Sequence, residues 1–290
     1  MNVKSLENEA LSLTVALHGA EIKSLKKKST GYEYMWQADP QFWGRTSPVL
    51  FPIVGNYKDK TSIYKGKSYQ LSQHGFARDM DFELESQTDS SITFVLKDSP
   101  ETLEKYPFHF ELRINYTLNE RSLVVKWSVK NTNDETMHFS IGGHPAFNCN
   151  LSKSYLKIKD TDVLNCAVLN SKGELSSKVV NIPLENNLLP LDSSLFDDDA
   201  LIVENSQCHE IILGTDTENN MGTDLLKVSF KAPVFGIWSP AGKNAPFVCI
   251  EPWYGRSDRE TFNQNLEERE WGNSLAPSET FEAEYTIEVF

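Results

Sequence analysis

The C-terminal segment TFEAEYTIEVF (280–290) alternates apolar and polar side chains. Apolar side chains occupy every second position from Phe281 to Val289, and glutamate or threonine residues lie between them. This period of two is typical of a β-strand, because successive side chains of a strand point to opposite faces of the sheet. The segment therefore predicts a half-buried strand, with its apolar face inward and its charged face outward.

The same alternation occurs twice in FELRINYTLNERSLVVKWSVKN (110–131), which predicts a β-hairpin with its turn at NERS. Further short strand-like runs, separated by turn-forming residues, lie at 11–17, 68–72, 80–86, 91–97, 155–160, 201–204, 210–213, 225–230 and 234–238.

Only SPETLEKYP (99–107) resembles a short helix, with Ser99 as its N-cap and Pro100 in its first turn. Many short strands and few short helices predict an all-β protein, a large antiparallel β-sandwich or a barrel. No stretch rich in Gly, Ser or Pro is long enough to act as a linker, so we expect residues 1–290 to form a single domain.

The charge and hydropathy of the chain argue against several classes of partner. The net charge of −13 argues against general binding to nucleic acid or anionic membranes, because both require clustered Lys and Arg. No apolar stretch approaches the roughly 20 residues of a membrane span. The N-terminus carries Glu7 and Glu9 before its apolar part and lacks a signal-peptide pattern.

The four cysteines are far apart and never form a C-x-x-C pair, so we expect reduced core residues in a cytoplasmic protein. They are Cys149, Cys166, Cys208 and Cys249.

Two histidines occur in unusual local contexts. In SIGGHPAFN (140–148), His144 follows two glycines and precedes a proline, in the middle of a strand-like run. In QHGFARD (73–79), His74 precedes a glycine and an aromatic residue. Glycine permits backbone angles and close approaches that other residues avoid, which would suit a ring that faces a ligand. A structural histidine that caps a carbonyl at a strand end is the alternative for both.

Glu251 and Arg45 are further candidates for a site. In PFVCIEPWYGRSD (246–258), apolar and aromatic residues flank Glu251, and loss of hydration would raise its pKa toward the range useful for proton transfer. A solvent-facing glutamate at a strand end is the alternative. In WGRTSPVLFPIVGNY (43–57), the forked donors of Arg45 could hold a ligand rich in hydroxyls, although the residue could equally be a surface charge.

Several common motifs are absent from the sequence, namely H-E-x-x-H, G-x-S-x-G, the P-loop and G-x-G-x-x-G. Two histidines and one glutamate could in principle bind zinc.

The segments GRTSPVLFPIVGNY, QHGFARDMDFEL, FSIGGHPAFN and PFVCIEPWYGRSD, in this order, resemble the aldose 1-epimerase (galactose mutarotase-like) family, and LAPSETFEAEYTIEVF resembles its closing strand. The chain looks like the shorter, divergent branch of that family. The resemblance spans nearly the whole chain and implies a sugar cleft on one sheet of a large antiparallel β-sandwich. It also implies interconversion of the α and β anomers of an aldose without a metal or other cofactor.

The resemblance also implies roles for individual residues. Glu251 takes the position of the family's general base, and His144 that of its general acid. His74 takes the position of the assisting histidine, and Arg45 that of a contact to sugar hydroxyls.

Two further substrate contacts follow from the resemblance. The family has a substrate-binding aspartate, for which the DDD run at 197–199 is the candidate, and we favour Asp199. Trp238 is a candidate for the aromatic wall of a sugar cleft, although a core position is equally consistent with its sequence context.

We expect a mutarotase for a free hexose such as galactose or glucose. A mutarotase for a hexose 6-phosphate is the nearest alternative, because Arg45, Arg78 and Arg256 lie in the quoted segments and could bind a phosphate. A sugar-binding module without catalytic activity is a further alternative. A glycoside hydrolase is disfavoured, because hydrolysis usually needs two carboxylates and the matched set has one glutamate and two histidines.

Overall fold

The computed structural model describes residues 2–217 and 220–290. The larger sheet has nine strands. In spatial order they are β17 (Leu188–Pro190), β14 (Ser154–Ile158), β19 (Glu210–Thr217), β20 (Asn220–Phe230), β24 (Thr280–Val289), β10 (Ser122–Asn131), β9 (Phe110–Asn119), β8 (Ser91–Lys97) and β7 (Glu83–Gln87).

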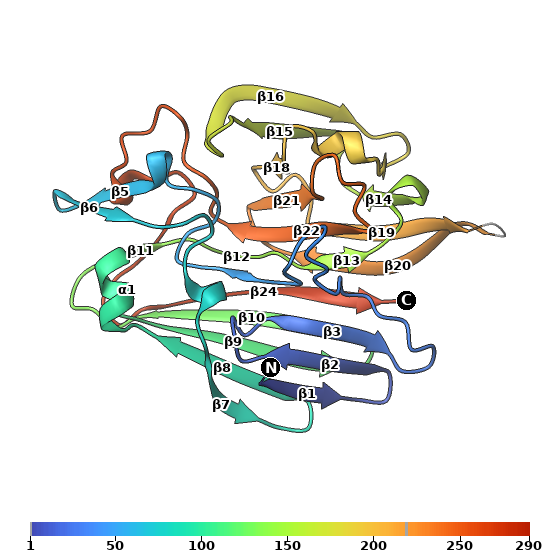
Figure 1. The fold of residues 1–290 in the computed structure, drawn as a ribbon, viewed down its shortest axis with the longest axis horizontal. Coiled ribbons are helices and arrows are strands. Elements are labelled where there is room, and N and C mark those ends of the chain that lie inside the picture. Colours follow the sequence, from blue (N-terminus) through green and yellow to red (C-terminus); the bar gives the residue numbers. More distant parts are fainter. Residues whose placement is uncertain (1, 218–219) are drawn as a thin grey trace.

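A second large sheet lies above it in Figure 1. Its order is β16 (Leu175–Pro183), β15 (Val163–Leu169), β18 (Leu201–Val203), β21 (Val234–Trp238), β22 (Phe247–Tyr254), β12 (Ile141–Gly143) and β4 (Val49–Leu50), and β13 (Ala146–Asn148) also pairs with β22. Neighbouring strands in both sheets are antiparallel.

The inner faces of the two large sheets pack against each other. Trp127 of β10 and Tyr285 of β24 reach Gly143 of β12, where an added Cβ atom would lie 3.2 Å from either ring. Both rings are almost completely buried and belong to a core cluster with residues of both sheets. The predicted antiparallel β-sandwich is confirmed.

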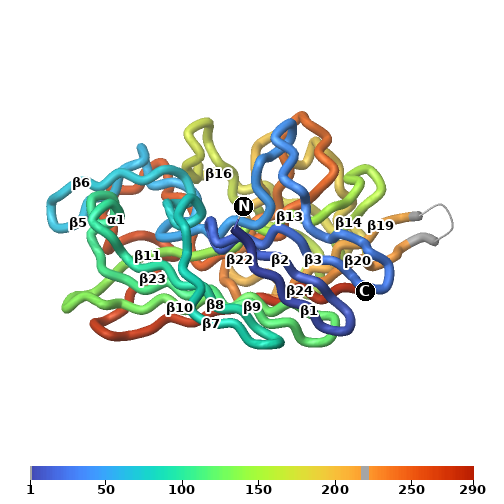
Figure 2. Tube along the Cα trace, turned by 60° about the horizontal axis from the view of Figure 1, so that its bottom comes forward, coloured from blue at the N-terminus to red at the C-terminus, as the bar shows by residue number. Residues whose placement is uncertain are grey.

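A smaller sheet of β1 (Val3–Glu7), β2 (Leu11–Ala16) and β3 (Ile22–Lys27) lies alongside the larger sheet, as Figure 2 shows. Buried leucines of β2 and β3 join the same core, and the hydroxyl of Tyr116 on β9 donates to the carbonyl of Ala20 over 2.5 Å. Two further sheets have two strands each. The strands β5 (Thr61–Tyr64) and β6 (Lys67–Gln70) form a hairpin, whereas β11 (Met137–Phe139) pairs with the distant β23 (Asn273–Leu275).

Helices are few and short in the described part of the chain. The α-helix α1 (Pro100–Lys105) begins as predicted, because the Ser99 side chain accepts from the backbone N–H of Thr102 in a capping box. Single 3₁₀ turns lie at Lys58–Lys60, Ala77–Asp79, Leu151–Lys153, Ser193–Phe196 and Leu266–Glu268. None of these described helices has the length and apolar character needed to cross a membrane.

The alternation patterns predict many of the strands but miss others, among them β1, β3, β5 and β17. In β24 every second residue from Ala283 to Val289 is buried. The predicted hairpin is confirmed, with β9 and β10 paired from Asn119↔Ser122 to Phe110↔Asn131. The pair β15–β16 was not predicted, because β16 is an exposed edge strand whose sequence LSSKVVNIP lacks a clear period of two.

The position of Trp253 on β22 depends on glycines in both neighbouring strands. A Cβ atom at Gly142 of β12 would lie 2.6 Å from Cδ1 of Trp253, and one at Gly236 of β21 would lie 2.7 Å from its six-membered ring. Contacts this short are not tolerated, so the indole lies flat on the sheet only because both glycines lack a side chain.

We expect Gly142→Ala to lower the free energy of unfolding by about 1–3 kcal/mol, as overpacking typically does. Urea unfolding would measure this change. Gly44→Ala is the matched control, since nothing lies within 4 Å of a Cβ atom at Gly44, and we expect it to stay within about 0.5 kcal/mol of the wild type. Equal stability of both variants would contradict the packing argument.

Candidate active site

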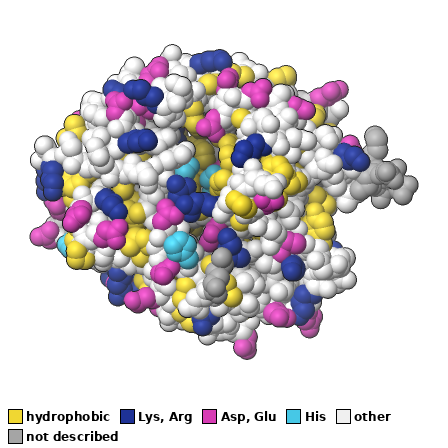
Figure 3. All heavy atoms as spheres, viewed as in Figure 1, with side chains coloured by type: hydrophobic (Ala, Val, Ile, Leu, Met, Phe, Trp, Pro, Cys, Tyr) yellow, Lys and Arg dark blue, Asp and Glu magenta, His cyan; other side chains and the backbone are white. Residues whose placement is uncertain are grey.

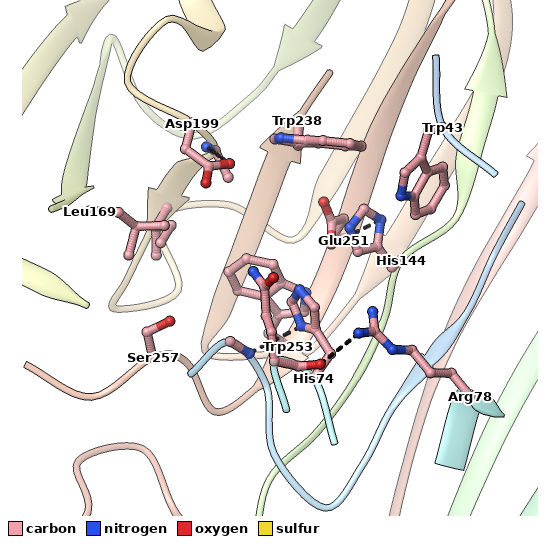
Figure 4. Close-up of a pocket in the computed structure, with 14 residues that line it drawn as sticks. Trp43, His74, Arg78, His144, Leu169, Asp199, Trp238, Glu251, Trp253 and Ser257 are labelled. Carbon is pink, nitrogen blue, oxygen red and sulfur yellow. Dashed lines mark hydrogen bonds and ion pairs between the residues drawn. The ribbon is translucent and has the colours of Figure 1, made fainter. Parts of the chain in front are cut away.

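A cavity of about 200 Å³ opens on the sheet that contains β22. Figure 3 shows a hollow in this face of the molecule with histidine, arginine and apolar side chains around it. Its lining residues, most of which are labelled in Figure 4, are Trp43, Gly55, Gln73, His74, Arg78, His144, Leu169, Asp199, Ala200, Ile202, Trp238, Glu251, Trp253 and Ser257.

Glu251 and His144 face each other across two neighbouring strands. The pairs Gly142↔Trp253 and Ala146↔Cys249 keep one continuous register, so His144 lies opposite Glu251. Between these pairs the ladder is interrupted, because Pro145 has no N–H to donate. The Nδ1 atom of His144 lies 3.3 Å from Oε2 of Glu251 (Figure 4).

Both groups are almost completely buried, with 9% of the His144 side chain and 1% of the Glu251 side chain exposed. Within residues 2–217 and 220–290, neither Nδ1 nor Oε2 has a hydrogen-bond partner of good geometry. Buried polar atoms are normally satisfied, and an unsatisfied pair that lines a cavity is suited to a polar ligand.

The surroundings of the pair favour its uncharged form. Burial, and then the negative charge of Asp199, raise the pKa of Glu251 well above its ordinary value. Burial, and then the positive charge of Arg78, lower the pKa of His144 to about 3. The pair therefore holds one proton, which can lie on the carboxyl or, when a ligand stabilises the carboxylate, on the imidazole.

His74 is held in one tautomer by the backbone of Gly55. The N–H of Gly55 donates to Nδ1 of His74 over 3.1 Å, so in the neutral ring the hydrogen is on Nε2. Burial, and then the neighbouring His144, lower the pKa of His74 well below its usual value. Its neutral ring is therefore a hydrogen-bond donor, and its centroid lies 5.7 Å from that of His144.

The backbone around His74 explains the glycine that follows it. Both His74 and Gly75 have positive φ, at 65° and 71°. A Cβ atom at Gly75 would lie 2.3 Å from the carbonyl oxygen of Phe51, so this close approach requires glycine. The turn brings the imidazole of His74 beside β4 and into the cavity wall.

Tryptophan rings enclose His144. Trp43 stacks on its imidazole with centroids 4.7 Å apart, and Trp238 meets it edge-on at 5.4 Å. Trp238 therefore lines the cavity rather than the closed core. Aromatic rings at this position shield the buried pair from water and offer flat apolar surfaces to a ligand.

Arg78 and Asp199 line the cavity from opposite sides (Figure 4). Nη2 of Arg78 donates to the carbonyl of Gln73 over 2.6 Å, whereas its buried Nε has no hydrogen-bond partner within the described chain and lies 3.8 Å from Oδ2 of Asp79. Asp199 has a positive φ of 77°, and its carboxylate accepts from the N–H of Ala200.

Two of the arginines considered from sequence lie elsewhere. Arg45 is not a lining residue and donates to Asp79 over 2.6 Å, so its contact with a sugar stays a prediction. Arg256 is buried between Glu204 and Glu270, and the expectation that it could bind a phosphate is wrong because these carboxylates already neutralise it.

The donor atoms of His144, Cys249 and Glu251 lie within 4.8 Å of one another. Burial and the charge of Glu251 raise the pKa of the Cys249 thiol well above its ordinary value. A metal ion held here would therefore have to displace the thiol proton.

Trp43, Gln73, Trp253 and Ser257 line the cavity but were not predicted. All four lie in segments quoted above, with Trp43 at the start of WGRTSPVLFPIVGNY. For Trp253 a signal was available, because residues two apart on a strand share a face and Glu251 is two positions before it.

The chain was compared with known proteins. A profile of the family described as Aldose 1-epimerase matches residues 3–288. The chromosomal LacX protein of Lactococcus lactis subsp. lactis is 34% identical over 299 residues, which cover 98% of each chain.

Two solved structures are similar over almost their whole length. A galactose mutarotase related enzyme from Lactobacillus acidophilus is 40% identical, with a TM-score of 0.91 and coverage of 99% of this chain and 97% of the other. A galactose mutarotase-like protein from Lactobacillus casei is 30% identical, with a TM-score of 0.92 and full coverage of both chains. The chain therefore belongs to the aldose 1-epimerase family.

Proposed function

We propose that this protein is a mutarotase that interconverts the α and β anomers of a free hexose. The observation that carries the proposal is the contact of Glu251 with His144 at 3.3 Å in the wall of a cavity. Similarity to proteins described as galactose mutarotase related supports the substrate class.

Ring opening requires the loss of one proton and the gain of another. The carboxylate of Glu251 accepts the proton of the C1 hydroxyl, while the imidazolium of His144 donates a proton to the ring oxygen. Rotation about the C1–C2 bond presents the other face of the carbonyl, and the reverse transfers close the ring. A hydrogen bond from the C1 hydroxyl stabilises the carboxylate and so favours the shared proton on His144.

The other lining residues hold the sugar. Nε2–H of His74 donates to a sugar oxygen near His144, and Arg78 and Asp199 bind hydroxyls on opposite sides of the ring. One positioned general acid or base contributes about 10²–10⁴-fold to a rate, so the pair accounts for roughly 10⁴–10⁸-fold.

We expect Glu251→Gln and His144→Asn each to reduce the anomerisation rate by at least about 10²-fold, because each removes one of the two proton-transfer groups. Polarimetry on freshly dissolved α-galactose or α-glucose measures the rate. Glu282→Gln and His209→Asn, at exposed positions, are matched controls that should leave it unchanged. A rate near that of the wild type in either site variant would disprove the assignment.

A hexose 6-phosphate is the second candidate substrate, because the buried Nε of Arg78 has no hydrogen-bond partner among the described residues and Arg45 contributes a nearby positive charge. Against it, Arg45 is already bonded to Asp79, and Asp199 adds a negative charge to the cavity.

We therefore expect a higher kcat/KM for free galactose or glucose than for the corresponding 6-phosphates, measured in parallel by polarimetry. Arg78→Gln tests whether Arg78 binds sugar hydroxyls rather than a phosphate. If it binds hydroxyls, the substitution should raise KM for both kinds of sugar by a similar factor. A preference for the phosphorylated sugar that Arg78→Gln abolishes would instead identify Arg78 as a phosphate ligand. Calorimetric binding of a sugar without acceleration of its mutarotation would favour a binding module.

A further inference from the structure

We propose that Trp253 is a positioning residue for Glu251, and that its indole N–H holds the ionised carboxylate in place beside His144. The inference rests on the proposed function, in which Glu251 is the base, and assigns a role to a residue that contacts neither reacting atom of the sugar.

Strand geometry brings the two side chains together. Glu251 and Trp253 are two residues apart on β22, so they share the face that lines the cavity. Gly236 is the register partner of Glu251, and the six-membered ring of Trp253 lies over Gly236. The indole therefore extends back along the strand to the row of Glu251.

The five-membered ring of the Trp253 indole is also fixed in place. Cδ1 of Trp253, the atom bonded to Nε1, packs over Gly142 of β12. Glycines on both neighbouring strands thus fix the indole flat on the sheet. Few rotamers are open to a ring in this position, and the direction of its N–H is set by the backbone of three strands.

The N–H of Trp253 is buried and unsatisfied. The residue is 5% exposed, and Nε1 has no hydrogen-bond partner of good geometry within the described chain. Oε2 of Glu251 is also buried and has no hydrogen-bond partner of good geometry within the described chain. An unsatisfied N–H beside the Glu251 carboxyl would stabilise its ionised form in particular. Hydrogen bonds to a charged acceptor are roughly twice as strong as those between neutral groups.

The remaining groups near Glu251 oppose its ionisation or are neutral. Asp199, from the loop before β18, acts with burial to raise the pKa of Glu251, and Trp253 acts in the opposite direction. His144 on the neighbouring strand is neutral, and Cys249 on β22 carries a thiol whose pKa is raised. Arg78 acts on the two histidines from across the cavity.

Trp253→Phe tests the proposal, because phenylalanine keeps an aromatic ring over the two glycines and removes the N–H. Without the donor the carboxylate is less stable, so the pKa of Glu251 rises and the pair keeps its shared proton up to a higher pH than in the wild type. Loss of that proton ends activity, so we expect the alkaline limb of the profile of kcat/KM against pH to move up by about one unit. Below that limb the rate should fall about 10-fold, because less of the pair exists as carboxylate and imidazolium, and above it the rate should approach that of the wild type, with little change in KM.

Trp238→Phe is the matched control, since it removes another indole N–H from the same cavity. It should leave the midpoint of the alkaline limb in place, whatever its effect on KM. A Trp253→Phe variant with a raised KM and an unchanged midpoint would mean that the N–H binds the sugar instead, and would overturn the proposal.

A second measurement does not depend on activity. In protein labelled with ¹³C at glutamate carboxyls, the Glu251 signal is assigned by its absence from Glu251→Gln and followed with pH. We expect a higher midpoint in Trp253→Phe than in the wild type, and an equal or lower one would refute the inference. If the wild type showed no mutarotation but the midpoint still rose, the proposed function would fail while the role of Trp253 would stand.

Discussion

The site depends on one contact, a carboxyl and an imidazole buried next to each other in the sheet. Each group alone would be costly to remove from water, and charged forms would cost more. Placed 3.3 Å apart, Glu251 and His144 can remain uncharged by sharing a proton between them. The same arrangement leaves one acceptor and one donor available to a ligand, as the proposed proton transfer requires.

The sandwich supplies the rigidity that this pair requires. β22 lies inside its sheet with β21 on one side and β12 and β13 on the other, and its inner face packs on the larger sheet. Two prolines and two glycines near the pair interrupt ordinary strand structure. Pro145 and Pro252 lack ladder donors, whereas Gly142 and Gly236 make room for the ring of Trp253. These four residues therefore make β22 and its neighbouring strands irregular around the carboxyl of Glu251.

The walls of the cavity come from connecting segments rather than from this sheet alone. Trp43 arrives from the segment before β4, His74 from the turn after β6, and Asp199 from the loop before β18. Such loop residues determine which ligand fits beside Glu251 and His144. Loops tolerate sequence changes more easily than a packed core does. In this protein they combine aromatic surfaces near His144 with opposite charges at Arg78 and Asp199.

The sequence by itself determined many of the strands, the β9–β10 hairpin and the short helix α1, because these depend on local periodicity, turns and caps. Motif similarity also identified Glu251, His144 and His74, which the fold brings together from three distant segments. Only the tertiary structure decided that Arg78 lines the cavity while Arg45 pairs with Asp79, and that Arg256 is neutralised by Glu204 and Glu270. Trp43 also emerged only there. The physical reason is that these outcomes depend on neighbours across strands and loops far apart in the chain, and neither period nor spacing carries that information.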